Sequence, residues 1–460
     1  MQEENFETNY LEDELELIPG LLEQKKFGEI KRILDDTNVA DVAAYFEDED
    51  EVSEKDLPVL YRLLGKEEAA EVFARLDSDT QSTLINILTD KELQQVLDDL
   101  FLDDTVDMIE EMPANVVARI LRNTDAKTRY QINELLKYPD DSAGSMMTVE
   151  YVNIKKDMSV VEAISRVRKM AENSETINTI YVTENRKLIG ICTIKELLIA
   201  ENEDRIEDIM ETNIITISTT DDQEDVAKMF NKYGFLAFPV VDKEERLVGI
   251  ITVDDAMEVL QDENTEDITK MAAITSAEDT YFKTSTFSHA KNRIVWLLVL
   301  MLSSTLTGTI ITKYEDAFAV VPLLVSFIPM LMDTGGNCGS QSSTLIIRGI
   351  ALDEIEFGDI FKVIFKEFRV AILVGAVLAV VNGLRIYIMY DSMQMAIVVA
   401  CSLVMTVIMA KLIGGVLPLL SKKMGLDPAL MAAPLITTVV DTCSILIYFR
   451  IATEFFHIAS

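Results

Sequence analysis

The length, composition and charge of this chain exclude a single soluble domain. It has 460 residues and a net charge of −37, yet its mean hydropathy is +0.19, which is too apolar for an ordinary acidic soluble protein. The last 180 residues hold 13 Lys and Arg against 12 Asp and Glu, a net of +1, which leaves −38 for the first 280. Such an acidic part repels nucleic acid and attracts cations, either as a solubilising surface or as a multivalent cation sensor.

The first 138 residues have the pattern of an all-α domain. Apolar residues recur at helical spacing over Leu63–Leu76 and again over Leu97–Pro113, where the proline should end the helix. Turn signals separate these short segments, which predicts a superhelical domain of stacked helices over residues 1–138. Residues 1–11 lack the basic and apolar runs of a secretory signal, so we expect this acidic part to stay in the cytoplasm.

An internal repeat follows at residues 139–202 and 203–260. The segment RKLIGICTIKELL, Arg186–Leu198, recurs as ERLVGIITVDDAMEVL, Glu245–Leu260. Each copy predicts a strand, a helix, two strands joined by a polar turn, and a second helix. This α/β unit, present twice, resembles a tandem cystathionine-β-synthase (CBS) pair.

CBS pairs often bind adenosine nucleotides through a Thr-x-x-Asp that touches the ribose, which Thr252 and Asp255 match. Copy one has Thr193 and Glu196 instead. The same spacing also makes an ordinary helix N-cap, so a nucleotide site and a cap both remain possible here. After copy two, residues 256–283 are predicted to form a long acidic helix, either a passive linker or a lever that gates a pore.

Five apolar stretches occupy residues 284–460, and each can supply the ~20 residues that span a bilayer. They are Ile294–Thr312, Phe318–Met332 with a continuation to Ile350, Val363–Tyr390, Met393–Leu420 and Pro428–Ile451. Basic residues gather before span one, between spans two and three, and between spans four and five. The positive-inside rule therefore predicts a cytoplasmic N-terminal part and a C-terminus outside the cell.

The second stretch is not apolar throughout. After two prolines it reads DTGGNCGSQ, in which Asp333, Asn337 and Gln341 accompany several small residues. Small residues alone serve close helix packing. The added polar side chains favour a segment that faces a cavity, since lipid cannot satisfy them.

Asp441 lies in the middle of the otherwise apolar fifth stretch. An ionisable residue at that depth is costly and indicates function. We find no Lys or Arg at comparable depth to neutralise it, so we expect a transported cation as its partner, with a carbonyl freed by Pro434 as a further oxygen ligand. The alternative is a protonated Asp bonded to a neighbouring helix.

An acidic helical domain, paired CBS units, an acidic connecting helix and five spans with GGNxGxQ and PLxxxxxD motifs resemble the MgtE family over essentially the whole chain. The resemblance implies a homodimeric magnesium channel of the plasma membrane that admits Mg²⁺ and is closed by cytosolic Mg²⁺. It implies Asp441 as the pore ligand. It also implies cytosolic magnesium ligands at Glu71, Asp103, Asp107, Glu224, Asp255, Glu258, Glu263, Glu266, Asp267 and Asp427.

Other classes are weaker. His289 and His457 are the only histidines, there is no Walker motif, and no catalytic constellation appears, so we do not expect an enzyme. The four cysteines form no CxxC pair and predict neither disulfides nor a zinc site. One alternative is a membrane-tethered nucleotide sensor that uses the CBS pair. Another keeps transport but exchanges the ion for Co²⁺, Mn²⁺ or Ca²⁺.

Overall fold

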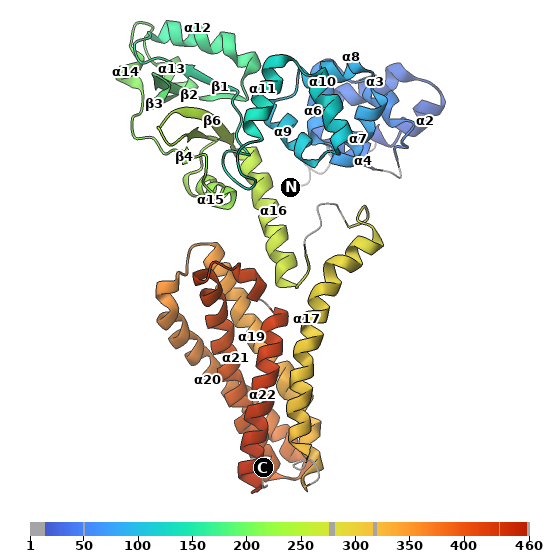
Figure 1. Ribbon diagram of the computed structural model, residues 1–460, viewed down its shortest axis with the longest axis vertical. Coiled ribbons are helices and arrows are strands. Elements are labelled where there is room, and N and C mark those ends of the chain that lie inside the picture. The colour runs from blue at the N-terminus through green and yellow to red at the C-terminus, as the bar shows by residue number, and fades with distance from the viewer. Residues whose placement is uncertain (1–13, 49–50, 276–280, 316–319, 432, 458–460) are drawn as a thin grey trace. The chain divides into compact units, whose positions relative to one another are not determined.

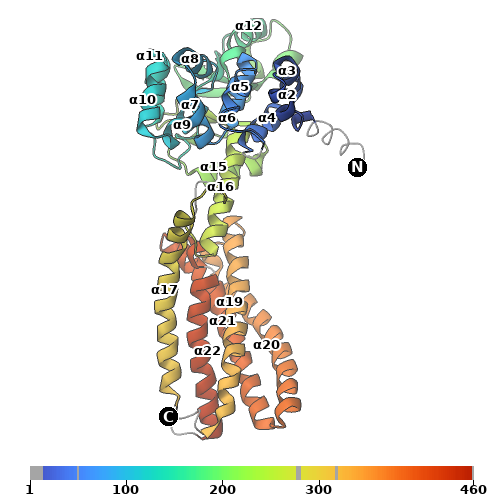
Figure 2. The same cartoon turned by 90° about the vertical axis from the view of Figure 1, so that its right-hand side faces the viewer.

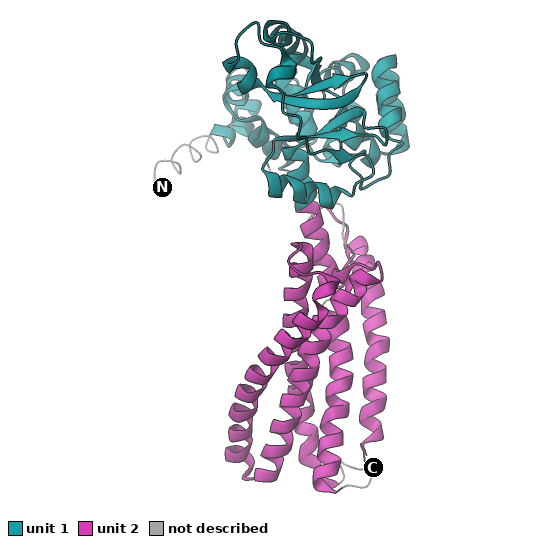
Figure 3. Ribbon diagram, turned by 90° about the vertical axis from the view of Figure 1, so that its left-hand side faces the viewer, with its two compact units in different colours: residues 1–260 teal, residues 261–460 magenta. Residues whose placement is uncertain are grey.

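The computed structural model describes residues 14–48, 51–275, 281–315, 320–431 and 433–457. The chain forms two compact units, residues 1–260 and 261–460, which Figure 3 colours separately. Each unit is described below by itself. The expectations for residues 1–11 and for a span that starts at Phe318 fall outside the described residues.

The N-terminal half of unit 1 is all helical, as the sequence predicts (Figure 1). Side chains of Asn38, Asp77 and Thr89 accept hydrogen bonds from the first turns of the helices that follow them, so short helices begin where the sequence places caps. Their apolar faces share one core. The helices are α2 (Ile18–Glu23), α3 (Phe27–Asp36), α4 (Val39–Glu47), α5 (Leu57–Tyr61), α6 (Lys66–Arg75), α7 (Ser78–Ile87), α8 (Asp90–Leu97), α9 (Leu102–Glu111), α10 (Ala114–Asn123) and α11 (Ala126–Leu135).

The repeat folds into two copies of one α/β unit, which confirms the predicted element order. In each three-stranded sheet the first strand is parallel to the second, and the second is antiparallel to the third. Copy one has β1 (Tyr151–Ile154), α12 (Val160–Met170), η1 (Ala171–Asn173), β2 (Thr176–Glu184), β3 (Lys187–Thr193) and α13 (Ile194–Ile199). α14 (Ile206–Ile209) comes next. Copy two then has β4 (Ile217–Ser218), α15 (Gln223–Tyr233), β5 (Ala237–Val241), β6 (Leu247–Thr252) and α16 (Val253–Met271).

The two copies exchange their leading segments. Thr148, ahead of copy one, pairs with Ile250 of copy two, and Glu211, ahead of copy two, pairs with Ile191 of copy one. Gly249 leaves room for Met147 of the incoming segment, because a Cβ there would lie 2.6 Å from its sulfur. The repeated glycine therefore serves the contact that ties the copies together.

The connecting helix is shorter than we expected. α16 ends at Met271 and not at Lys283, because the chain leaves helical geometry at Ala273, whose φ is +56°. Residues 276–280 of the expected helix lie outside the described part, and the next helix begins at Thr286.

Unit 2 is a bundle of long helices that lie side by side (Figure 2). α19 packs against α21 and α22, α21 also packs against α20, and α17 lies along α22. The bounds are α17 (Thr286–Lys313), η2 (Pro322–Phe327), α19 (Ile328–Ala351), η3 (Phe357–Asp359), α20 (Ile360–Tyr390), α21 (Met393–Lys423), η4 (Pro428–Met431) and α22 (Ala433–Phe456). Within the described residues, α17, α20, α21 and α22 are long and apolar enough to cross a membrane; α19 has the length but is more polar.

Candidate functional site

The small residues of α19 carry its packing. Where α19 meets α22, a Cβ at Gly336 would lie 2.8 Å from Thr437, and one at Gly339 would lie 2.8 Å from Ile436. Where α19 meets α21, a Cβ at Gly414 would run into the backbone of Gly339. Glycine is therefore required at these positions for the helices to approach so closely.

The polar side chains of α19 lie on a different face. Asp333, Asn337 and Gln341 follow each other at intervals of four residues and are exposed, while Gly335, Gly336 and Gly339 are buried. The packing interpretation is confirmed for the glycine face, and the cavity interpretation stays a prediction for the exposed polar face. In a bilayer the exposed polar face needs water or another protein surface.

Asp441 of α22 is half-buried, and its Oδ1 atom is buried without a hydrogen-bond partner in the described part of the chain. The hydroxyl groups beside it are engaged elsewhere. Thr442 Oγ1 lies 2.8 Å from Thr307 Oγ1 of α17, and the Ser444 hydroxyl donates to the carbonyl of Val440. The alternative of an Asp bonded to a neighbouring helix therefore finds no support at Oδ1. A carboxylate oxygen left free in this way is available to a cation or its water.

Pro434 does not interrupt a helix, contrary to our expectation. α22 begins at Ala433, so the proline lies in the first turn, where its missing N–H costs nothing. Its own carbonyl accepts a hydrogen bond from Thr438, and the carbonyl of Met431 accepts one from Ser343 of α19. Neither of these two carbonyls is therefore freed in the way that we expected.

Sequence reasoning missed a buried charged group in unit 2. Lys411 of α21 and Glu367 of α20 are both nearly inaccessible. The Ser342 hydroxyl of α19 donates to Glu367 Oε2 at 2.5 Å and accepts from Lys411 Nζ at 3.2 Å. Lys411 stands alone in an apolar stretch of the sequence, and only the fold reveals its partners. The two hydrogen bonds of Ser342 therefore join α19 to α20 and α21.

In unit 1 the structure brings three of the expected magnesium ligands together. Asp103 and Asp107 lie one turn apart on α9, and the charge of Asp255 at the start of α16 acts on both. The charge of Asp255 also acts on Asp104 and Glu175, two residues that the sequence analysis did not predict as ligands. We call these five residues the acidic cluster. Glu175 precedes β2, so both CBS copies and the helical domain contribute to it.

Burial and mutual repulsion make the charged form of this cluster costly. Burial and then Asp255 raise the pKa of Asp104 to about 6, and burial followed by Asp104 and Asp255 raises the pKa of Glu175 to about 8. The same causes, burial first, raise the pKa of Asp103 well above its ordinary value. Neighbouring carboxylates also raise the pKa of Asp107, but its side chain is exposed to solvent, and water weakens their electrostatic effect there. A cation would offset this repulsion.

Other expected ligands lie apart from the cluster or have partners of their own. Glu71 is exposed on α6. Glu224 of α15 forms an ion pair of 2.8 Å with Lys228. Glu258 is exposed but acts on Asp104 and Asp107 from the next turn of α16. Glu263 and Asp267 lie half-buried further along the same helix.

Two further expected ligands are bridged by a lysine. In unit 2, Lys270 Nζ lies 2.5 Å from Glu266 Oε1 and 2.8 Å from Asp427 Oδ2. Burial lowers the pKa of Lys270, but the hydrogen bonds to Asp427 and Glu266 outweigh it and hold that pKa above its ordinary value. The ammonium group thus lies between two carboxylates that the resemblance implied as magnesium ligands.

Thr252 and Asp255 form a local cap. The buried Thr252 hydroxyl donates to Asp255 Oδ2 at 2.5 Å, and Thr193 makes the matching bond to Glu196 at 2.9 Å in copy one. Both Thr-x-x-acid segments therefore cap the helices that they begin.

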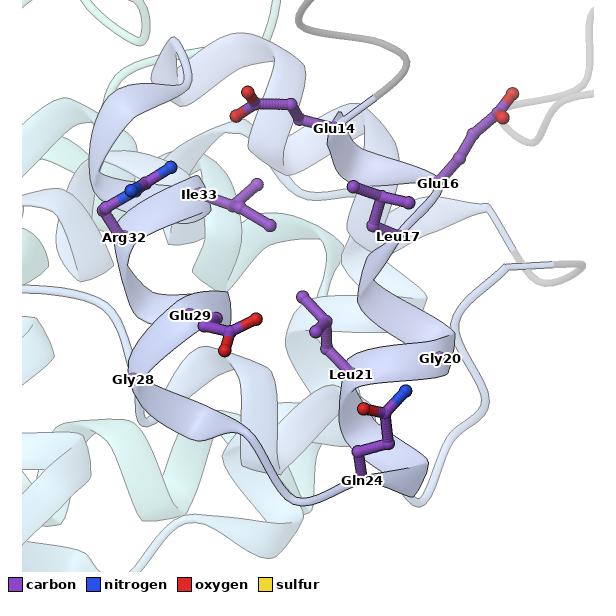
Figure 4. Close-up of a pocket in the computed structure, with 10 residues that line it drawn as sticks. All are labelled: Glu14, Glu16, Leu17, Gly20, Leu21, Gln24, Gly28, Glu29, Arg32 and Ile33. Carbon is purple, nitrogen blue, oxygen red and sulfur yellow. The ribbon is translucent and has the colours of Figure 1, made fainter.

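Within the described residues, no three His, Cys, Asp or Glu side chains lie close enough together to hold a metal ion as they stand. A hollow of about 510 Å³ opens between α2 and α3 (Figure 4), lined by residues that include Glu14, Glu29, Arg32 and Leu21. None of the expected site residues lines it, and we assign it no role.

These features define a class: membrane proteins whose apolar helices carry an acidic soluble part built on a CBS pair. Family models agree. The MgtE model, described as a divalent cation transporter, matches residues 328–451. The model of the MgtE intracellular N domain matches residues 37–141, and the CBS domain model matches residues 143–203 and 206–262.

Curated relatives extend the match to the whole chain. The magnesium transporter MgtE of Bacillus subtilis is 35% identical over 451 residues, which cover 98% of this chain and 99% of the relative. The magnesium transporter MgtE of Thermus thermophilus is 35% identical over 429 residues, which cover 92% of this chain and 94% of the relative. The crystal structure of the cytosolic domain of the Mg²⁺ channel MgtE in complex with ATP matches with a TM-score of 0.50 at 33% identity, covering 54% of this chain and 99% of that one. The chain therefore belongs to the MgtE family.

Proposed function

We propose that this chain is a homodimeric magnesium channel of the plasma membrane that admits Mg²⁺ and closes when cytosolic Mg²⁺ binds its acidic domains. The observation that carries the proposal is the buried, unpartnered Oδ1 of Asp441 in an apolar helix. The names of the relatives, magnesium transporters over nearly their full lengths, support the choice of ion. The soluble domains lie in the cytoplasm and the C-terminus outside, in line with the basic loops.

One carboxylate per protomer suits magnesium. Mg²⁺ gives up water reluctantly and is usually held by one or two carboxylates together with several retained waters. Two Asp441 side chains facing each other in a dimer would hold such a hydrated ion. A cage that strips the ion of water would need more oxygen ligands, which is the preference of Ca²⁺.

The exposed polar face of α19 supports the proposed dimer. Asp333, Asn337 and Gln341 cannot face lipid without a large cost. A second copy that presents the same face would enclose these side chains in a shared aqueous path. Twofold symmetry makes such a surface self-complementary.

The acidic cluster supplies the regulation. Without a cation its carboxylates repel, and magnesium would relieve that repulsion by binding the compact form better than the open one, which is the condition for any ligand to shift the balance. The ligands that we propose for this cytosolic control are Glu71, Asp103, Asp107, Glu224, Asp255, Glu258, Glu263, Glu266, Asp267 and Asp427.

ATP is a further ligand that we propose for the CBS pair, because a relative's cytosolic domain was solved in complex with it. Thr252 and Asp255 would contact its ribose only after exchanging their mutual hydrogen bond for bonds to the nucleotide. Calorimetric titration of the chain with ATP measures this directly. A protein that only senses nucleotide at the membrane would have no need of Asp441.

The test is Mg²⁺ uptake into proteoliposomes by the chain and by Asp441→Asn. We expect uptake by the chain, a loss of at least tenfold in the variant, and normal uptake by Asp391→Asn, which makes the same change at the exposed turn after α20. Equal uptake by Asp441→Asn would place the ion path elsewhere. Uptake of Co²⁺, Mn²⁺ or Ca²⁺ in preference to Mg²⁺ would keep transport and change the ion.

A further inference from the structure

The contacts between α19 and α22 fix which residues of the two helices share a level. The helices are antiparallel: Gly339 meets Ile436 and Val440, Gly336 meets Thr437, and Gly335 meets Val440 and Ser444. As the residue number falls along α19, it rises along α22. Asp441 lies between Val440 and Ser444 and is therefore level with Gly335, so Asp333, two residues earlier on α19, lies within one turn of the level of Asp441.

The two side chains also lie on the same side of this contact. Asp441 follows Thr437 by four residues and lies on its face of α22, whereas Asp333 precedes Gly336 by three and lies about 60° round α19 from it, at the edge between the buried glycine face and the exposed polar face. Asp333 is the charged group whose field reaches Asp441. Its side chain is exposed, while Oδ1 of Asp441 is buried without a partner among the described residues.

Among the described residues of unit 2 neither carboxylate forms an ion pair, although the Arg385 guanidinium of α20 lies 3.6 Å from the Met330 sulfur, one turn before Asp333. The buried Lys411 is committed to Ser342 and Glu367. Ser342 lies nine residues after Asp333, more than two turns away along α19. Two carboxylates within one turn of each other in a membrane-spanning bundle, without an ion pair among the described residues, favour a cation or its water beside them.

We infer that Asp333 is a second carboxylate of the ion path, which works with Asp441 to set the affinity for the entering divalent cation. The inference rests on the proposed function. Each protomer would then offer an exposed carboxylate beside a recessed one. A hydrated Mg²⁺ would meet Asp333 only through its water shell, while Asp441 of each protomer holds the inner position, so the inner carboxylates of a dimer remain two.

The different roles inferred for Asp333 and Asp441 can be tested with single substitutions. In proteoliposomes we expect Asp333→Asn to raise the half-saturating Mg²⁺ concentration roughly tenfold, the loss of one charge interaction at about 6 Å in a partly hydrated setting. The maximal rate should change much less, whereas Asp441→Asn should lose it. Asp333→Glu, which keeps the charge, should restore most of the affinity, and Asp391→Asn should leave both quantities unchanged.

The possible outcomes distinguish failure of the proposed function from failure of the inference about Asp333. If the unmodified chain takes up no Mg²⁺, the proposed function fails. If the chain transports and Asp333→Asn keeps the same half-saturating concentration, the inference alone is overturned. It is also overturned if Asp333→Asn lowers the melting temperature and the maximal rate together without a change in that concentration, since this is the effect of a purely structural residue. Should Asp333→Asn fail to fold, Asp333→Glu carries the test: a half-saturating concentration within about threefold of the unmodified chain supports the inference, and loss of saturable uptake by the folded variant overturns it.

Discussion

A carboxylate that is buried beside other carboxylates costs free energy until a proton or a cation neutralises it. The acidic cluster of unit 1 has this property, because Asp255 acts on Asp103, Asp104 and Asp107 within a partly dehydrated site. At the scale of single residues, the stored repulsion is what a regulatory magnesium ion would act on.

We predict that the combined change Asp103→Asn, Asp107→Asn and Asp255→Asn leaves the channel active at high internal Mg²⁺. Three neutral amides remove the carboxylate ligands through which magnesium would bind the closed form, so the ion no longer shifts the balance toward that form. The measurement is uptake into vesicles that are preloaded with increasing Mg²⁺.

A matched control removes three charges from exposed positions: Asp41→Asn, Glu201→Gln and Glu203→Gln. We expect the control to shut off as the unmodified chain does. Normal shut-off in the cluster variant would contradict the role of the cluster.

Single residues were predictable from the sequence where they broke a local pattern. Asp441 interrupts an apolar run, and Asp103 and Asp107 match a family motif. Glu175 lies in an ordinary polar turn and becomes part of the cluster only through the packing of copy one on the helical domain. Lys411 also interrupts an apolar stretch of the sequence, but its partners come from α19 and α20, so no local pattern indicated its hydrogen bond and ion pair.

At the scale of elements, the acidic connecting helix shows the limit of composition. An unbroken run of charged and apolar residues predicted a helix to Lys283, but α16 ends at Met271 because Ala273 adopts a positive φ. No glycine or proline marks that end. The α/β copies were easier to predict, because strand alternation, polar turns and capping residues all agree locally.

Lys270 places a positive charge on α16 between the carboxylates of Glu266 and Asp427. We predict that Lys270→Met raises uptake at low internal Mg²⁺ by roughly threefold to tenfold, because the loss of two partly exposed charge contacts removes about 1 kcal/mol from the contact of α16 with Asp427. At saturating internal Mg²⁺ the ion should replace the ammonium group between Glu266 and Asp427, and uptake should match that of the unmodified chain.

The control for this prediction is Lys270→Arg, which keeps the positive charge. Vesicle uptake at a series of internal Mg²⁺ concentrations distinguishes the variants. If Lys270→Met and Lys270→Arg give the same curve as the unmodified chain, the bridge from Lys270 to Asp427 has no part in regulation.

At the scale of the whole molecule, the order of parts follows from charge and hydropathy. The net charge of −38 in the first 280 residues and the near-neutral apolar remainder separate a soluble part from a membrane part before any motif is considered. The polar face of α19 could be predicted as polar but not as exposed, because exposure depends on which neighbours its glycines admit. The sequence could therefore predict Asp441 as a pore ligand, whereas the inference that pairs Asp333 with Asp441 required the packing.

The soluble part should lose stability as pH rises when magnesium is absent. For an acid whose pKa is raised in the folded protein, the folded state binds more protons than the unfolded state between the two pKa values. For Asp104 and Glu175 that window runs from the unfolded values near 4 up to about 6 and about 8. Stability is therefore greatest at the acidic end of this window and declines toward pH 8.

We predict that residues 1–271, produced alone with a chelator, melt several degrees lower at pH 8 than at pH 6, since about 1 kcal/mol shifts a domain of this size by roughly 2–4 °C. A relative's cytosolic domain was crystallised by itself, so such a fragment is a reasonable sample. Added Mg²⁺ should raise the melting temperature more at pH 8, where it meets ionised carboxylates, than at pH 6. In the triple variant Asp103→Asn, Asp107→Asn and Asp255→Asn, both the pH dependence and the magnesium effect should shrink. If the melting temperature rises between pH 6 and pH 8 without Mg²⁺, the carboxylates are not in mutual repulsion, and the cluster is not the element that magnesium relieves.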